Sequence, residues 1–166
     1  MDKFIVNGGN QISGSVDISG AKNAVLPLMT AALLVDGNTT INSVPDLRDT
    51  RTMIRLLEII GANVIFKNNS LSINASDVNN LEAPYDLVKT MRASFYVLGP
   101  LMGRFGYAKV SLPGGCAWGP RPVDYHLKGF EKLGAEIILE EGYIIARAKK
   151  LKGAEIHFEI PSVGAT

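Results

Sequence analysis

The sequence predicts an α/β domain built from two copies of a helix–strand–helix–strand–strand unit. The first observation is an internal repeat, in which residues 56–75 align with residues 129–148 at an offset of 73. The second is that the helical and strand patterns upstream of these segments also match, at an offset of 69. The third is a glycine after the second helical pattern of each copy, Gly61 and Gly134, where a left-handed residue ends a helix.

In the first unit, the apolar run at 24–35 contains Pro27 and Thr30 and is typical of a buried helix. A second helical pattern ends at Gly61, and the Asn68-Asn69 turn then separates two short alternating segments that indicate a β-hairpin. The expected elements are a helix at 21–35, a strand at 39–43, a helix at 49–60, and strands at 63–67 and 70–74.

The second unit repeats this order with a Glu141-Gly142 turn in its hairpin. Its expected elements are a helix at 90–103, a strand at 108–112, a helix at 122–133, and strands at 136–140 and 143–147.

Such a unit cannot cover both faces of its own small sheet, so neighbouring units are expected to pack helix against helix. Residues 161–166 fall where a third copy would begin its first helix. We therefore expect the chain to be a fragment of a longer protein, with a short natural end as the alternative.

Composition excludes several classes of protein. The 166 residues are 46% hydrophobic and 20% charged, which is typical of a globular domain. The net charge is +1 with no basic stripe, which argues against a nucleic-acid partner. The most apolar run is shorter than the roughly 20 residues that span a membrane, and the N-terminus lacks the features of a secretory signal. A single cysteine permits no internal disulfide and fits a reducing cytoplasm.

That cysteine, Cys116, lies in a glycine- and proline-rich loop at 112–124, just before a helical pattern. Cysteines that only fill space usually lie inside periodic apolar segments, so this position indicates a chemical role. Three cations, Lys22, Arg92 and Arg121, lie at predicted helix starts, where unpaired N–H groups already carry partial positive charge. This placement favours phosphate or carboxylate recognition, although solvated surface charges are the alternative.

The remaining polar groups carry weaker signals. His126 is interpreted either as a ligand contact or as a partly buried structural residue, and His157 is expected to face solvent. The Glu140-Glu141 pair belongs to a turn and is not expected to act as an acid/base pair. The sequence contains no metal-ligand spacing, Walker A motif or dinucleotide fingerprint, so no metal and no cofactor are expected.

Five motifs in order carry a family resemblance across the chain. They are SGAKNA at 19–24, KTMRAS at 89–94, PGGCA at 113–117, GPRPVD at 119–124 and PSVGAT at 161–166. Together they closely resemble the UDP-N-acetylglucosamine enolpyruvyl transferases. The resemblance implies an inside-out α/β barrel with two domains of three repeats each. Residues 1–18, with a strand around 4–6, would then belong to the missing second domain, and residues 19–166 to the first.

The resemblance implies transfer of the enolpyruvyl group of phosphoenolpyruvate to the 3-hydroxyl of UDP-N-acetylglucosamine, the first committed step of bacterial peptidoglycan synthesis. It implies that Cys116 is the loop acid and the target of fosfomycin, that Lys22 and Arg121 hold phosphoenolpyruvate, and that Asn23 positions the reacting hydroxyl. The nucleotide sugar would be contacted by Arg92, Arg121, Pro122, Val123, Asp124, Tyr125, Ser162, Val163 and Gly164. His126 is a further candidate for this contact.

Two departures from the family pattern weaken these assignments. Trp118 stands where a smaller aliphatic residue is usual, and Tyr125 stands where leucine is common. The family's aspartate base and a further arginine belong to the missing C-terminal domain, so this chain alone is expected to be inactive. A non-catalytic UDP-sugar-binding repeat domain is the alternative function, and the sibling family that acts on shikimate phosphate shares the fold.

Overall fold

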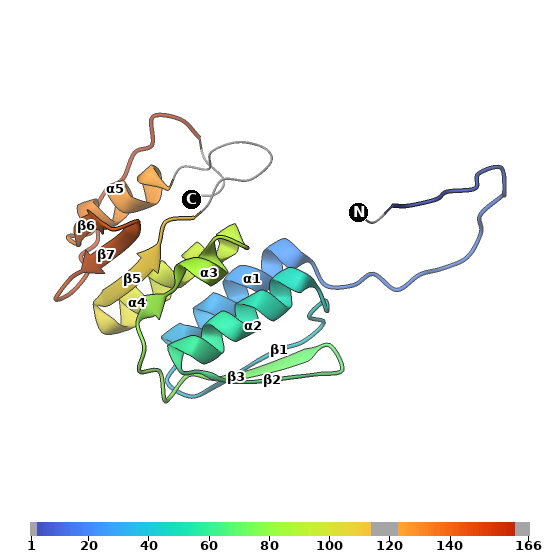
Figure 1. Cartoon of the computed structure of the whole chain (residues 1–166), viewed down its shortest axis with the longest axis horizontal. Helices are drawn as coiled ribbons and strands as arrows, with labels where there is room; N and C mark the ends of the chain where they lie inside the picture. The colour runs from blue at the N-terminus through green and yellow to red at the C-terminus, as the bar shows by residue number, and fades with distance from the viewer. Residues whose placement is uncertain (1–2, 114–122, 162–166) are drawn as a thin grey trace.

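The computed structural model describes residues 3–113 and 123–161, which form two helix-and-sheet units side by side (Figure 1). In the first unit, α1 and the short 3-10 helix η1 precede β1, α2 and the hairpin of β2 and β3. The bounds are α1 Lys22–Ala31, η1 Ala32–Leu34, β1 Asn38–Ile41, α2 Arg48–Ile60, β2 Asn63–Lys67 and β3 Ser70–Asn74.

The second unit repeats this order after a short connection that contains β4 and α3. The connection has β4 at Glu82–Ala83 and α3 at Tyr85–Val88, and the second unit has η2 Arg92–Val97, α4 Leu98–Phe105, β5 Tyr107–Ser111, α5 Asp124–Lys132, β6 Glu136–Glu140 and β7 Tyr143–Arg147. All ten predicted elements of the two units are therefore confirmed, four of the strands with their predicted bounds.

Hydrogen bonds repeat between the two units. Gly61 and Gly134 both have positive φ, 106° and 91°. The next residue donates back to the preceding helix in each case, Ala62 N–H to the Leu57 carbonyl and Ala135 N–H to the Phe130 carbonyl, both at 2.9 Å. These bonds satisfy carbonyls that a helix end would otherwise leave free, so the glycine ends both helices by the same geometry.

The two sheets differ by one strand. The first has the order β1-β3-β2 and is antiparallel, with Asn38 opposite Asn74. The second has the order β4-β5-β7-β6, with Tyr107 opposite Arg147 and β4 parallel to β5. The two registers are equivalent by the sequence offsets, so β4 is an addition that comes from the connection between the units.

The helices form the shared core, as the repeat predicts. α1 packs against α2 and η2, and α4 packs against η1, so the two units meet helix against helix (Figure 1). Arg104 of α4 joins them, because its Nη1 donates to the carbonyls of Leu33 and Ala75 at 3.0 and 2.8 Å. The largest fully buried side chains are Met29, Leu33, Met53, Leu56, Leu57, Ile60, Leu71, Ile73, Leu98, Leu101, Met102 and Ile144.

One predicted helix, at 90–103, has a different form. It begins as the 3-10 helix η2 and becomes α-helical only at Leu98. Pro100 is consistent with the change, because it has no N–H to donate to a preceding turn and is best accommodated in the first turn of an α-helix, where it lies in α4.

Residues 3–19 form no helix or strand and extend away from the folded body (Figure 1). Their apolar side chains are uncovered, and Phe4 is 99% exposed. The strand expected around 4–6, in a second domain, stays a prediction. Within the described parts of the chain, every helix is too short or too polar to cross a membrane.

Candidate functional site

The structure describes seven of the predicted site residues, and they lie at three helix starts. Lys22 and Asn23 begin α1, Arg92 begins η2, and Val123, Asp124, Tyr125 and His126 surround the start of α5. The remaining predicted site residues, and the departure at Trp118, lie outside the described residues; these are Cys116, Arg121, Pro122, Ser162, Val163 and Gly164.

Lys22 is the first residue of α1, and this helix has neither a side-chain cap nor an acidic residue in its first turn. The cation is held instead by Asp49 in the first turn of α2, with Nζ and Oδ2 3.0 Å apart. Both side chains are partly exposed, so the pair can open to a ligand at little cost. An anion that replaced Asp49 would meet both the ammonium and the free N–H groups of α1.

The sequence reasoning did not single out Asp49. A carboxylate in the first turn of a helix is ordinary, because it complements the helix dipole, so its position carried no functional signal. Only the packing of α1 against α2 brings it to Lys22.

Gly20 holds the start of α1 against the loop that precedes α2. A side chain at Gly20 would collide with the backbone carbonyl of Ser43, and Ser43 itself has a φ of 56°. The SGAKNA motif therefore needs glycine for a close backbone approach. This approach places Lys22 and Asn23 near the start of α2.

Arg92 is a half-buried cation beside this region, because η2 packs against α1. Within residues 3–113 and 123–161, the side chains of Arg92 and of the exposed Asn23 form no hydrogen bond or ion pair. A cation at a helix start without a carboxylate partner is suited to hold an anionic group.

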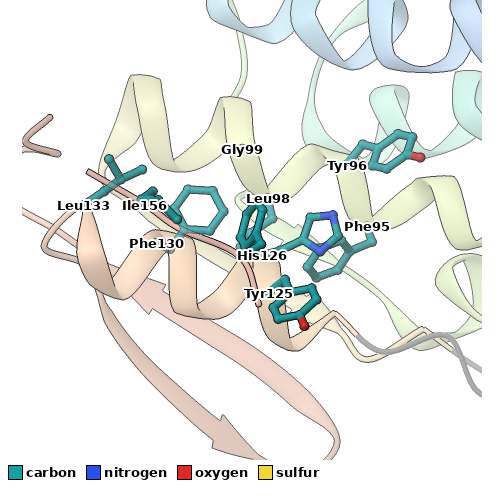
Figure 2. Close-up of a pocket in the computed structure, with 11 residues that line it drawn as sticks. Phe95, Tyr96, Leu98, Gly99, Tyr125, His126, Phe130, Leu133 and Ile156 are labelled. Carbon is teal, nitrogen blue, oxygen red and sulfur yellow. The ribbon is translucent and has the colours of Figure 1, made fainter. Parts of the chain in front are cut away.

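The start of α5 differs from the other two because aromatic packing dominates it. Val123 is buried, and its carbonyl accepts from the Leu127 N–H at 3.1 Å. The His126 ring lies edge-on against Phe95, with ring centroids 5.3 Å apart and an interplanar angle of 85° (Figure 2). This contact gives His126 a packing role, and a contact of His126 with a ligand stays a prediction. His157 is exposed, as predicted.

An apolar hollow of about 280 Å³ lies between η2, α4 and α5 (Figure 2). Tyr125 lines it and packs against Phe158, with ring centroids 5.2 Å apart and an interplanar angle of 41°. Its other lining residues are mainly aromatic and aliphatic, including Phe95, Phe130 and Ile156. The hollow can therefore accept apolar groups and lacks the charges that phosphate recognition needs.

A polar groove of about 570 Å³ lies between the first half of α2 and α3. It is lined by Arg48, Arg51 and Arg55 of α2 and by Asp46 and Asp86. Arg51 donates to both carboxylate oxygens of Asp46 at 2.6 Å, and this hydrogen bonding lowers the pKa of Asp46 below 3.8. The positive charge of Arg51 is thereby balanced by the Asp46 carboxylate. Among the described residues, no group of three or more His, Cys, Asp or Glu side chains is arranged to hold a metal ion.

Comparison with known proteins gives three kinds of match. A family model described as EPSP synthase (3-phosphoshikimate 1-carboxyvinyltransferase) matches residues 6–166. Proteins named UDP-N-acetylglucosamine 1-carboxyvinyltransferase, from Chloroherpeton thalassium and Chlorobaculum parvum, are 59% and 56% identical over the whole chain. The chain spans only 39% and 40% of the length of these curated relatives.

Among solved structures, the enolpyruvyl transferase NikO from Streptomyces tendae is similar with a TM-score of 0.73 and 26% identity, over 87% of this chain and 32% of that one. EPSP synthase from Acinetobacter baumannii is similar with a TM-score of 0.71 over 92% of this chain and 36% of that one. At 16% identity, the latter match concerns the fold alone.

Proposed function

The chain belongs to the EPSP synthase (3-phosphoshikimate 1-carboxyvinyltransferase) family, and from this premise we propose that it is the N-terminal part of an enolpyruvyl transferase that acts on UDP-N-acetylglucosamine. The whole protein transfers the enolpyruvyl group of phosphoenolpyruvate to the 3-hydroxyl of the sugar and releases phosphate. Phosphoenolpyruvate and UDP-N-acetylglucosamine are its substrates, and the missing C-terminal domain is the partner of this chain.

The single observation that carries the choice of acceptor is the 59% identity to a UDP-N-acetylglucosamine 1-carboxyvinyltransferase over the whole chain. Identity to the EPSP synthase structure is 16%, which supports a shared fold alone. The sugar-nucleotide branch is therefore favoured over the shikimate branch.

The reaction needs an acid, a base and several cations. Protonation of the methylene carbon of phosphoenolpyruvate makes the adjacent carbon oxocarbenium-like, and the sugar hydroxyl adds there as it gives its proton to a base. The resulting tetrahedral ketal then loses phosphate, and a proton leaves the methyl group to restore the double bond. Fixed positive groups stabilise the negative charge of phosphate and carboxylate throughout these steps.

The described residues supply part of this charge. Lys22 lies at the start of α1 with Asp49 as its partner, and we assign Lys22 to the phosphate and carboxylate of phosphoenolpyruvate. When substrate enters, the Lys22 ammonium exchanges the Asp49 carboxylate for the more highly charged ligand. Asn23, exposed on the next position of α1, is assigned to the reacting hydroxyl and ketal.

The remaining roles follow the family resemblance. Cys116 is assigned as the acid that protonates the methylene carbon and as the residue that fosfomycin alkylates, and Arg121 as a second cation for phosphoenolpyruvate. The nucleotide sugar is assigned to Arg92, to residues 121–126 and to residues 162–164. The base is assigned to the C-terminal domain, so this chain alone is inactive. A peptidoglycan precursor enzyme of this type works in the bacterial cytoplasm.

The test is phosphate release by the full-length product, with phosphoenolpyruvate and either UDP-N-acetylglucosamine or shikimate 3-phosphate. We expect release with the sugar nucleotide only, and a fosfomycin adduct on Cys116 in peptide mapping. Lys22→Met should lower kcat by about 10²–10³-fold, as loss of one transition-state cation does. The matched control is Lys67→Met, at an exposed lysine at the end of β2, which should leave kcat unchanged.

Two outcomes would contradict the proposal. Release with shikimate 3-phosphate alone would move the protein to the sibling branch. Binding of UDP-N-acetylglucosamine without any phosphate release would favour the alternative of a non-catalytic UDP-sugar-binding domain.

A further inference from the structure

Residues 152–161, here called the strap, run along α5 without forming a helix or strand of their own. At one end, the Lys152 N–H donates to the carbonyl of Leu133, just past the end of α5, at 2.8 Å. In the middle, Ile156 lies beside the buried Gly129, whose Cβ, if present, would be 4.0 Å from the Ile156 Cδ1 atom. At the other end, Phe158 packs against Tyr125 in the first turn. The strap is therefore attached along the full length of α5.

The first unit has an equivalent segment with one attachment missing. Asn79 and Asn80 donate to the carbonyl of Ile60 at 3.2 and 3.1 Å, as Lys152 does to Leu133. At the other end, however, the offset of 73 places Thr52 where Tyr125 stands and Tyr85 where Phe158 stands. Within the described ranges, the aromatic attachment therefore occurs in the second unit alone.

Tyr125 makes two contacts through its ring. The ring packs against Phe158 on the strap, and the Lys128 Nζ lies 5.8 Å from the ring centroid, one turn along α5. Both contacts restrict the rotation of the Tyr125 side chain. Tyr125 also lines a second hollow, of about 290 Å³, which lies between α5 and the strap, and Ile156 and Phe158 of the strap line both hollows.

We propose that Tyr125 and Phe158 form a positioning pair that locks the strap onto the first turn of α5. This inference rests on the proposed function, which assigns nucleotide-sugar contacts to residues 121–126 and 162–164. Those two segments are 36 residues apart in the sequence, and the pair brings the chain that leads to the second, ending at Pro161, to the helix start that follows the first. In place of the direct contact that the family resemblance assigns to it, Tyr125 then acts on sugar-nucleotide affinity through its ring contact with Phe158.

The test uses the full-length protein with Tyr125→Ala, Phe158→Ala and the double variant. Each single variant should raise the KM for UDP-N-acetylglucosamine about 3–10-fold, the factor to which the coupling of an aromatic pair corresponds, with a smaller effect on kcat. The double variant should resemble the singles, because the first substitution already breaks the pair. Tyr125→Phe should recover most of the lost affinity, since it keeps the ring.

The control is His157→Ala, on the same strap but 83% exposed, which should leave KM unchanged. Two results would overturn the proposal. The first is a double variant whose increase in KM equals the product of the two single increases. The second is a Tyr125→Phe variant with a KM as high as that of Tyr125→Ala, which would make the hydroxyl a direct ligand contact.

Hydrogen exchange separates this inference from the proposed function, because it needs no activity. Tyr125→Ala and Phe158→Ala should both speed exchange of the Lys152 amide, whose hydrogen bond to the Leu133 carbonyl attaches the strap to α5, and His157→Ala should not. If exchange is unchanged in Phe158→Ala, the pair does not hold the strap and the inference is wrong. If exchange responds as expected but the wild-type protein releases no phosphate, the proposed function is wrong, and the inference that Tyr125 and Phe158 hold the strap still stands.

Discussion

In the first unit, the surface between α1 and α2 is closed by the segment that follows it, whereas the equivalent surface between α4 and α5 is the open hollow of Figure 2. The 3-10 helix η2 packs against both α1 and α2, and its Val97 side chain is fully buried. The backbones of the two units are nevertheless equivalent in strand register and helix ends. The repeat therefore specifies the backbone arrangement that the two units share. The side chains at the helix starts and between the helices give each unit a different surface.

The helix starts differ in the same way. α2 begins with Arg48 and Asp49, which face a polar groove and Lys22. α5 begins with Asp124, Tyr125 and His126, and two of these pack against aromatic rings. The start of α2 is therefore charged and the start of α5 is aromatic, although the two helices occupy equivalent positions in their units.

The largest expected difference concerns Leu57 and Phe130, which occupy equivalent positions. Leu57 is fully buried, so Leu57→Ala should lower the free energy of unfolding by about 3 kcal/mol. Phe130 lines the open hollow, so Phe130→Ala should cost less, about 1–2 kcal/mol, although its side chain is larger. Urea unfolding followed by circular dichroism measures both. A greater loss for Phe130→Ala would mean that the hollow is closed in solution.

A smaller difference is expected at the two helix-ending glycines. A Cβ at Gly61 would lie 2.9 Å from the Asp77 carbonyl oxygen, but at Gly134 it would meet no heavy atom within 4 Å. Both positions have positive φ, which costs alanine about 1 kcal/mol in either unit. Gly61→Ala should therefore lower the melting temperature more than Gly134→Ala. Equal shifts would show that backbone strain alone determines the cost.

The smallest effect concerns the polar groove in front of α2. Hydrogen bonding from Arg51 holds the pKa of Asp46 below 3.8, so the ion pair stabilises the folded chain above that pH and is lost as pH falls through the lowered pKa. Asp46→Asn should therefore destabilise the chain slightly at pH 7, and the difference from wild type should shrink as the pH falls below 3.8 and through the lowered pKa of Asp46. Unfolding at several pH values measures it, with Asp77→Asn as the exposed control. A difference that persists in acid would contradict the assignment.

Much of the fold followed from local patterns in the sequence. Two hairpin turns, at Asn68-Asn69 and Glu141-Gly142, and two helix-ending glycines, at 61 and 134, depend only on residues close in the sequence. All of these positions have the expected positive φ. Pro100 changed the form of one helix, which periodicity alone did not reveal. β4 and α3 were missed because they are short and one of them depends on pairing with β5.

The candidate site was predicted less completely. The sequence by itself determined the repeat, the helix starts that carry Lys22 and Arg92, and the resemblance to an enolpyruvyl transferase, because these depend on residue types at fixed spacing. Tertiary structure alone decided that Asp49 pairs with Lys22, that His126 packs on Phe95, and that Tyr125 meets Phe158. Each of these contacts joins residues at least 27 positions apart in the sequence. Local sequence patterns do not show which distant segments pack together, so these contacts could be read only from the tertiary structure.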